Sequence, residues 1–346
     1  MADLNGEILV SVLTTAAAVT RQPLGKMMHV AADATFSPQY KEYTTAAALA
    51  ADGDVGAIGK AAGATFFSQE VHPPQLLIGK YNSVNALDDE LDLILAAITE
   101  AGDNFYVLTI SERAQGEIEL AAAWAAANDK FFVYRTGDTD VIDGVAANVM
   151  LNLEASSSPV AGIWHDVVTY GGEWPDVALA AYKIAANPDE KVVAWYDAQL
   201  VGVTPQTNEM TATQWTTVQG YNGGAYLRLM GSPAMGGGLL HDGKWIDEKI
   251  TLDWLGTRIR EDIAQLRLDI SKLQELLDPY NGGLGKIFEV LSKRVETAES
   301  IGHIAPGRTE IVLPEPEEIT DRNAVITING VMHGGIKTFS LTVRLV

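Results

Sequence analysis

The chain ends on Gly334-Gly335-Ile336-Lys337-Thr338-Phe339-Ser340-Leu341-Thr342-Val343-Arg344-Leu345-Val346, in which apolar and polar residues alternate from Thr338 onward. A period of two over eight residues is typical of a half-buried β-strand. A strand that reaches the last residue must pair with an earlier part of its own chain or with another chain, because an unpaired apolar edge promotes association. The pair Gly334-Gly335 can act as a hinge, since glycine adopts positive φ at little cost.

A second strand is expected at the other terminus. Residues Glu7 to Thr14 are rich in β-branched side chains, and Ile8, Val10 and Val12 share one face. Two terminal strands fit a sheet within one chain that brings the ends together, and they fit equally an exchange of strands between subunits. The pattern alone leaves both possibilities open.

Composition excludes several classes of protein. A chain of 346 residues with 47% hydrophobic residues can build two domains with sizeable cores. Its 45 acidic and 24 basic residues give a net charge of −21, which argues against binding to nucleic acid or to anionic lipid. The absence of cysteine excludes disulfides and zinc–thiolate sites. Without a long apolar run or a basic start, neither membrane insertion nor a signal peptide is expected.

Residues 21–225 alternate between short apolar strands and helices, which predicts an α/β domain with mainly parallel strands. Gly-rich residues 52–63 are expected to form a loop. The expected strands are 27–32, 75–79, 105–110, 130–134, 160–164 and 225–230, and the expected helices are 44–51, 85–100, 111–128, 145–153, 174–186 and 211–219.

The C-terminal part predicts an α+β domain built on a long helix pair. One apolar stripe runs from Leu252 to Leu277 at helical spacing, and Asp278-Pro279 should end that helix. A second helix follows and ends near Ile301-Gly302. Residues 232–238 are expected to be a loop and 310–321 an exposed connector. Within Val325 to Met332, Asn329-Gly330 favours a hairpin turn.

The sequence contains no strong motif for a catalytic, nucleotide-binding or metal-binding site. The Walker A motif and the Gly-x-Ser-x-Gly elbow are absent, and the six histidines show no metal-ligand spacing. Asp138, Asp140 and Asp143 resemble a calcium loop, but Ile142 stands where an oxygen ligand is needed. The best enzymatic candidate is His165-Asp166, at the end of a predicted strand. An α/β enzyme of unknown substrate with a site near these two residues is therefore the alternative function.

Three segments, taken in order, resemble the contractile tail sheath proteins of myophages. They are Gly243-Lys244-Trp245-Ile246-Asp247, then Leu252-Asp253-Trp254-Leu255 opening the long helix, then Ile301-Gly302-His303-Ile304-Ala305-Pro306-Gly307 before the terminal β segment. The resemblance covers about residues 225–346.

The resemblance implies a structural subunit, with no enzymatic activity and no cofactor. Such a subunit forms a homo-oligomer of stacked hexameric rings around a tail tube protein, in contact with baseplate and tail terminator proteins. It is assembled in the host cytoplasm and becomes part of the virion tail, where contraction drives the tube through the host envelope for genome ejection. A sheath subunit of a related contractile injection system is the second alternative.

The resemblance also implies a division of labour along the chain. It divides the chain into an N-terminal arm (1–20), an α/β outer domain (21–225), an inner polymerisation domain (226–333) and a C-terminal arm (334–346). In the family, both arms donate strands that complete the small β-sheet of neighbouring subunits. The linking residues carried over are Ile8, Val10, Val12, Ile336, Phe339, Leu341, Val343 and Leu345, with Gly334 and Gly335 as the hinge.

Basic residues gather on the helix pair in a chain that is otherwise acidic. Lys286, Lys293 and Arg294 are the candidate contacts with an acidic tube. The alternative is a solvated helix face with ion pairs at i,i+4 spacing.

Overall fold

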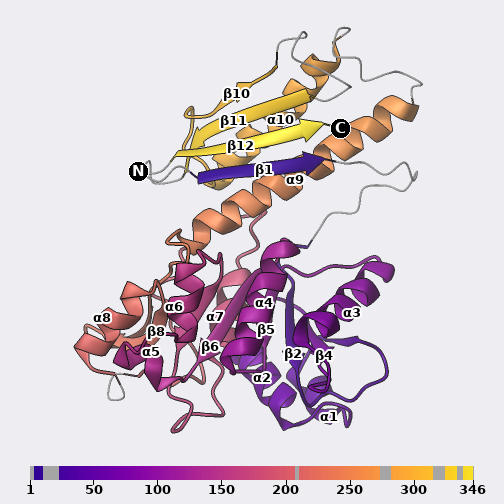
Figure 1. The fold of residues 1–346 in the computed structure, drawn as a ribbon. Helices are drawn as coiled ribbons and strands as arrows, with labels where there is room; N and C mark the ends of the chain where they lie inside the picture. Colours follow the sequence, from indigo (N-terminus) through magenta and orange to yellow (C-terminus); the bar gives the residue numbers. More distant parts are fainter. Residues whose placement is uncertain are drawn as a thin grey trace. The chain divides into compact units, whose positions relative to one another are not determined.

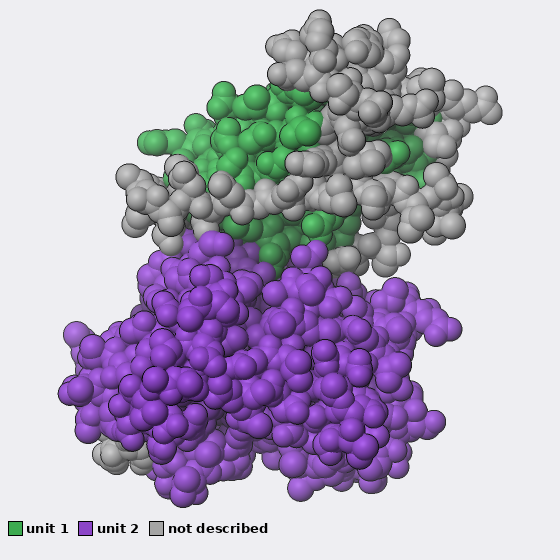
Figure 2. All heavy atoms as spheres, in the orientation of Figure 1, with its two compact units in different colours: residues 1–22, 188–192, 250–346 green, residues 23–187, 193–249 purple. Residues whose placement is uncertain are grey.

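The computed structural model describes residues 4–10, 23–206, 210–272, 282–314, 324–332 and 338–345. The chain divides into two compact units (Figure 2). Unit 1 comprises residues 1–22, 188–192 and 250–346, and unit 2 comprises residues 23–187 and 193–249. Each unit has its own sheet (Figure 1).

Unit 2 is a three-layer α/β structure. Its sheet has the strand order β3-β4-β2-β5-β6-β7-β8-β9. The six inner strands are parallel to one another, and the edge strands β3 and β9 pair antiparallel with β4 and β8. The expected α/β layer is therefore present. The strands are β2 (Met27–Ala31), β3 (Tyr40–Tyr43), β4 (Leu76–Lys80), β5 (Val107–Ile110), β6 (Phe131–Thr136), β7 (Ala161–Trp164), β8 (Gly224–Leu229) and β9 (Ser232–Gly236).

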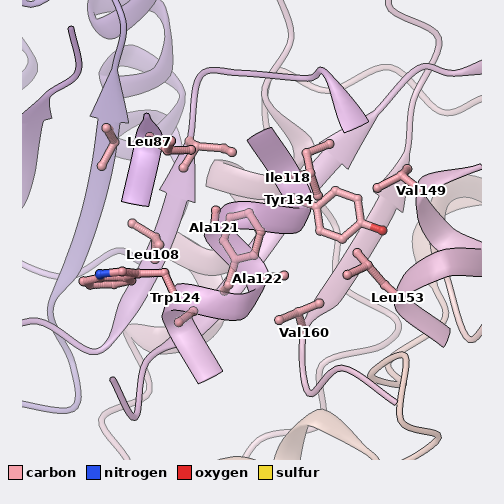
Figure 3. Close-up of a cluster of buried hydrophobic side chains, with 14 of the residues drawn as sticks. Leu87, Leu108, Ile118, Ala121, Ala122, Trp124, Tyr134, Val149, Leu153 and Val160 are labelled. Carbon is pink, nitrogen blue, oxygen red and sulfur yellow. The ribbon is translucent and has the colours of Figure 1, made fainter. Parts of the chain in front are cut away.

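Helices cover both faces of this sheet. One face packs on the main apolar core, which includes Leu87, Ile118 and Leu153 from the helices and Leu108 and Tyr134 from the strands (Figure 3). The helices on this face are α3 (Leu87–Glu100), α4 (Gln115–Ala127), α5 (Thr139–Asp143), α6 (Val149–Ala155) and α8 (Ala212–Gly220). On the other face α2 (Ala57–Ser68) and α7 (Pro175–Ile184) contact each other and strand β2, and α1 (Ala46–Ala51) packs on α2.

Unit 1 combines a helix pair with a four-stranded sheet. Helix α9 (Ile246–Lys272) begins with four residues that belong to unit 2 and continues into unit 1, followed by α10 (Gly283–Ile301). The predicted helix pair is confirmed over these residues, whereas the end expected at Asp278-Pro279 lies outside the described residues. The strands are β1 (Leu4–Val10), β10 (Glu310–Val312), β11 (Ala324–Val331) and β12 (Thr338–Leu345).

Predictions of irregular structure are wrong at three places. Residues 310–312, expected to belong to the exposed connector, form β10, which pairs antiparallel with β11. Residues 57–68 form helix α2, in which glycine allows neighbouring side chains to approach the backbone closely. A Cβ on Gly63 would lie 1.9 Å from Leu49 Cδ2, and a Cβ on Gly59 would lie 2.7 Å from Val55 Cγ1. Residues 232–236 form β9, which pairs antiparallel with β8. Since β8 and β9 complete the sheet of unit 2, the units divide between Lys249 and Ile250, later than the expected boundary at residue 225.

Candidate functional site

The terminal strand β12 lies inside the small sheet of unit 1, whose order is β1-β12-β11-β10. It pairs in parallel with β1, from Leu4 opposite Phe339 to Val10 opposite Leu345. On its other side it pairs antiparallel with β11, from Val331 opposite Thr338 to Ala324 opposite Leu345. In the single chain, then, both terminal strands close the sheet of their own subunit.

The side chains of β12 follow the predicted period of two. Phe339, Leu341 and Val343 are buried, with at most 3% of each exposed, whereas Ser340 and Thr342 are half-buried. Strand β11 buries Ile326 and Ile328 in the same way. In the ladder, Ile8 of β1 lies opposite Val343. Four residues that were expected to link subunits or to form the hinge lie outside the described residues: Val12, Gly334, Gly335 and Ile336.

The hairpin expected at Asn329-Gly330 is wrong, since both residues continue strand β11. Gly330 lies opposite Phe339 in the ladder, and a Cβ at Gly330 would lie 2.5 Å from Phe339 Cε1. The missing side chain leaves the space that the ring of Phe339 occupies, which is a common reason for glycine inside a strand.

The stability of the small sheet should depend on the absence of a side chain at Gly330. We expect Gly330→Val to destabilise unit 1 by about 1–3 kcal/mol, because overpacking of that size forces a side chain out of its rotamer. The double variant Gly330→Val/Phe339→Ala should recover part of the loss, since the ring is then absent. Chemical denaturation of both variants measures this, and additive losses would contradict the account.

The three candidate tube contacts on α10 differ in their surroundings. Arg294 is only 10% exposed and donates from Nε and Nη2 to both carboxylate oxygens of Asp262 on α9, at 2.6 and 2.8 Å. Its charge is thus neutralised within the helix pair. Lys286 and Lys293 are exposed on the opposite side of the same helix from the buried residues Ile287 and Leu291.

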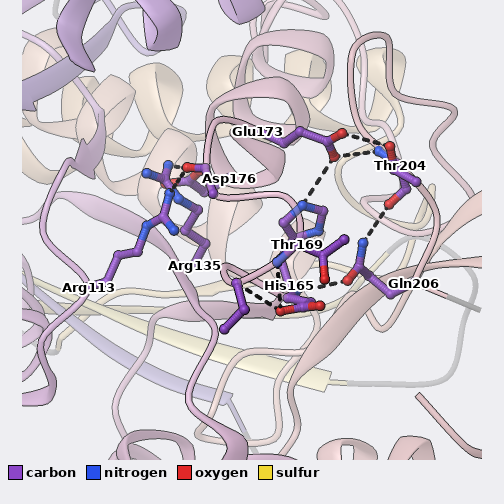
Figure 4. Close-up of polar contacts among 11 residues, drawn as sticks. Arg113, Arg135, His165, Thr169, Glu173, Asp176, Thr204 and Gln206 are labelled. Atoms are coloured by element: carbon purple, nitrogen blue, oxygen red, sulfur yellow. Dashed lines mark hydrogen bonds and ion pairs between the residues drawn. The ribbon is translucent and has the colours of Figure 1, made fainter. Parts of the chain in front are cut away.

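The side chain of His165 is inaccessible to a substrate, and Figure 4 shows the polar side chains around it. His165 is fully buried, with Nε2 3.2 Å from Glu173 Oε2, and burial lowers its pKa to about 4. Asp166 Oδ1 accepts hydrogen bonds from the backbone N–H groups of Val168 and Thr169 and so shapes a turn. Glu173 in turn accepts from the backbone and the hydroxyl of Thr204. This arrangement holds a loop together and keeps the imidazole of His165 away from solvent.

A buried ion pair lies close to His165 and was not predicted (Figure 4). Arg135 on β6 and Asp176 in the first turn of α7 are both fully buried, and Arg135 Nη1 lies 2.9 Å from Asp176 Oδ1. The guanidinium also stacks on Trp174, 3.3 Å from the ring centroid. Desolvation lowers the pKa of Arg135 to about 10 in spite of the carboxylate. The only sequence signal for this pair is an arginine inside an otherwise apolar strand.

The aspartates that resemble a calcium loop have structural roles. Asp138 caps helix α5 by accepting from Asp140 N, and Asp143 accepts from Gln214 Nε2. Among the described residues no group of three or more acidic or histidine side chains is placed to hold a metal ion. None of the described helices combines the length and apolar character needed to cross a membrane.

Comparison with known proteins gives matches at the level of structure. No protein-family model matches the sequence, and a search of curated proteins finds no match. The helical sheath protein of the anti-feeding prophage in its contracted state has a TM-score of 0.62 and 13% identity, over 93% of both chains. The sheath of the PVC extracellular contractile injection system has a TM-score of 0.64 and 10% identity, over 93% of this chain and 92% of that one.

A sheath tail protein from Listeria innocua is similar as well, with a TM-score of 0.58 and 7% identity over 95% of this chain and 97% of that chain. These matches span both units, whereas the sequence motifs covered only the C-terminal third. All three matched proteins are sheath proteins. The chain therefore has the fold of contractile tail sheath proteins.

Proposed function

We propose that this protein is the structural subunit of a contractile sheath, which polymerises as stacked hexameric rings around a tube and contracts to drive that tube through a host envelope. The similarity to sheath proteins over at least 93% of the chain supports this role. The matches include sheaths of injection systems and of tails, so the proposal covers both kinds of particle. In a phage it would place the protein in the virion tail, beside the tail tube, baseplate and tail terminator proteins.

The observation that carries the proposal is the position of β12. The last strand of the chain lies between β1 and β11, so the sheet cannot close without it. In the sequence, residues 333–337 lie between Met332 and β12, and residues 11–22 lie between β1 and Pro23, the first residue of unit 2. If β1 and β12 are supplied by neighbouring subunits, the same ladders form and the subunits become linked.

Exchange of identical strands changes the free energy little, because the closed and the exchanged forms make the same contacts. The link itself is strong. Each ladder hydrogen bond contributes roughly 0.5–1.5 kcal/mol, and each of the buried side chains Phe339, Leu341 and Val343 contributes about 1.5–3 kcal/mol. Such a link can survive a rearrangement in which weaker contacts between subunits are replaced.

Electron microscopy of the purified protein tests the proposal. The full chain is expected to assemble into ribbed tubes, and a variant that lacks residues 338–346 is expected to remain unassembled. Unit 2 of the truncated variant should keep its cooperative unfolding, since its core contains no residue of β12. Ribbed tubes formed by the truncated variant would contradict the role of β12, and a full chain that never forms tubes, with or without a tube protein, would contradict the sheath function.

Contact with an acidic tube is the part of the proposal that concerns Lys286 and Lys293. We expect Lys286→Glu/Lys293→Glu to reduce the amount of sheath on purified tubes by about tenfold at low salt, with a smaller effect at high salt because exposed charges are screened. Lys60→Glu, in helix α2 of unit 2, is the matched control and should assemble normally. Normal assembly of the double variant on tubes would exclude these two lysines as contacts.

A further inference from the structure

The hairpin of β8 and β9, at one edge of the sheet of unit 2, extends past the neighbouring strand β7. The ladder between β7 and β8 ends at Ala225. The ladder between β8 and β9 continues to Leu229, and the two residues after Leu229 form the turn. We call residues 229–232, which are the turn and one residue on either side of it, the β8–β9 tip.

The turn holds a methionine in a conformation that favours glycine or asparagine. Met230 has a φ of 51° and Gly231 a φ of 88°. Positive φ at both central residues is typical of the type I′ turn, in which asparagine, aspartate and glycine are preferred. The conformation is strained for methionine, because its Cβ comes too close to the following carbonyl oxygen. The backbone of the tip is therefore better suited to asparagine than to the residue it carries.

The side chain of Met230 makes no compensating contact that would bury it in its own subunit, since it is fully exposed. Every other methionine that the structure describes is buried, namely Met27, Met28, Met150, Met210, Met235 and Met332. A residue that breaks a local rule without a gain in the folded chain is expected mainly at functional sites. Methionine is flexible and polarisable, which suits it to apolar contacts with another protein surface.

The charge pattern of the chain indicates which partner the tip fits. A chain with a net charge of −21 repels a second copy of itself, so two copies should touch where carboxylates are absent. The three longest stretches without aspartate or glutamate are residues 8–32, 210–241 and 322–346. The first and the last contain terminal strand residues that link subunits in the proposed function, and the middle one contains the β8–β9 tip. Arg228, beside the tip, is exposed and opposite in sign to the net charge.

We propose that the β8–β9 tip binds a second copy of the chain, with the side chain of Met230 buried in the contact. The choice of a second copy rests on the proposed function, whereas the strain and the exposure of Met230 are properties of unit 2 alone. A side chain that becomes buried only on assembly stabilises the assembled sheath without stabilising the subunit.

The variant Met230→Asn separates these two effects. Asparagine suits the turn, so unit 2 of the variant should resist urea at least as well as the parent. Assembly should be weaker. The protein concentration needed for ribbed tubes, measured by sedimentation and electron microscopy, should rise by about tenfold, because the contact loses one buried apolar side chain. Unchanged assembly would overturn the proposal, and so would a less stable unit 2, since Met230 would then be held by its own subunit.

Val84→Asn is the matched control. Val84 is 88% exposed and lies in a turn between β4 and α3 of unit 2. The substitution therefore removes an exposed apolar side chain outside the tip, and this variant should form tubes at the same concentration as the parent. An equal loss of assembly in both variants would mean that the position of the apolar side chain does not matter, which would overturn a specific contact at the tip.

Oxidation by hydrogen peroxide provides a second readout on the unchanged chain. Peroxide transfers one oxygen atom to the thioether of methionine, which gives the sulfoxide and leaves water. In free subunits Met230 should be oxidised before the buried methionines. In tubes the oxidation of Met230 should be at least about tenfold slower, because the contact shields its sulfur. Mass spectrometry of peptide fragments measures both rates and distinguishes Met230 from Met235.

The outcomes separate this contact from the sheath function itself. If the parent forms tubes in which Met230 is oxidised as fast as in free subunits, the contact is wrong and the sheath function stands. If the parent forms no tubes, with or without a tube protein, both proposals are wrong.

Discussion

Replacement of Asp176 by alanine is expected to lower the free energy of unfolding of unit 2 by about 3–5 kcal/mol, because it leaves a buried guanidinium without its carboxylate. Arg135 is 1% exposed, and its Nε and Nη2 already have no hydrogen-bond partner among the described residues. Asp176 Oδ1 lies 2.9 Å from Arg135 Nη1, so its carboxylate neutralises the buried guanidinium. The loss is measured by urea denaturation followed by circular dichroism.

Two further variants separate loss of the ion pair from loss of a helix-capping charge. Asp140→Ala removes an exposed acidic residue from the first turn of α5 and should cost less than about 1 kcal/mol. Arg135→Met/Asp176→Leu replaces both charges by apolar side chains and should recover most of the stability. A loss below about 1 kcal/mol in Asp176→Ala would contradict a desolvated ion pair at this position.

Mild acid should destabilise unit 2 by about 4 kcal/mol between pH 7 and pH 5.5, through three buried histidines. Burial and the charge of Arg135 lower the pKa of His29 to about 3. Burial lowers the pKa of His165 to about 4 and that of His241 to about 4, although the Tyr221 carbonyl opposes the shift at His241. In the unfolded chain these groups bind protons near pH 6.5, before the folded chain does.

The direction in which stability changes with pH follows from the lowered pKa values of the three histidines. A histidine whose folded pKa is lowered contributes stability that is fully present above about pH 6.5 and is lost as the pH falls towards its folded pKa. Each such group costs about 1.4 kcal/mol per pH unit within that window. The lowered pKa of Asp52, about 2, acts only below about pH 4, so it does not overlap.

Denaturation curves at pH 7.0, 6.0 and 5.5 check this dependence. His29→Gln should reduce the slope of stability against pH by about one third, since one of three comparable groups no longer titrates. A stability of unit 2 that stays constant over this range would mean that the three histidines are charged or accessible in the folded chain.

Local patterns were sufficient to predict most elements of unit 2 and the helix pair of unit 1. Period-two strands such as β12 and the apolar stripe of α9 are properties of adjacent residues, so they can be read without the fold. Predictions failed in segments that contain glycine, which was taken as a sign of a loop or a turn. Gly63 and Gly330 are used for close packing against Leu49 and Phe339, and such use depends on partners that are distant or unknown at the level of sequence.

The buried polar contacts that were missed join residues far apart in the chain. Arg258 donates a hydrogen bond to Asp189, 69 positions away, and Arg135 pairs with Asp176, 41 positions away. No local pattern marks such pairs. His165 was correctly placed at the end of a strand, yet the covering loop that buries it, with Glu173 and Thr204, could not be predicted from the residues beside it.

In the single chain, β12 completes the sheet of its own subunit. The account requires that in the assembled sheath this strand comes from a neighbouring subunit. Cysteine cross-linking between two kinds of subunit tests this requirement, since the natural chain contains no cysteine. Thr327 of β11 and Thr342 of β12 are opposite each other in the ladder, and both are half-buried. One subunit carries Thr327→Cys, and a second, distinguishable by mass, carries Thr342→Cys.

The two subunits are mixed before assembly, oxidised as assembled particles, and separated without reductant. Donation of β12 to a neighbour predicts a disulfide-linked dimer of one subunit of each kind. A chain that carries both substitutions should then form linked multimers on assembly. If mixed particles yield no such dimer, and the doubly substituted chain forms its bond only within itself, the terminal strands do not link subunits and the proposed assembly is wrong.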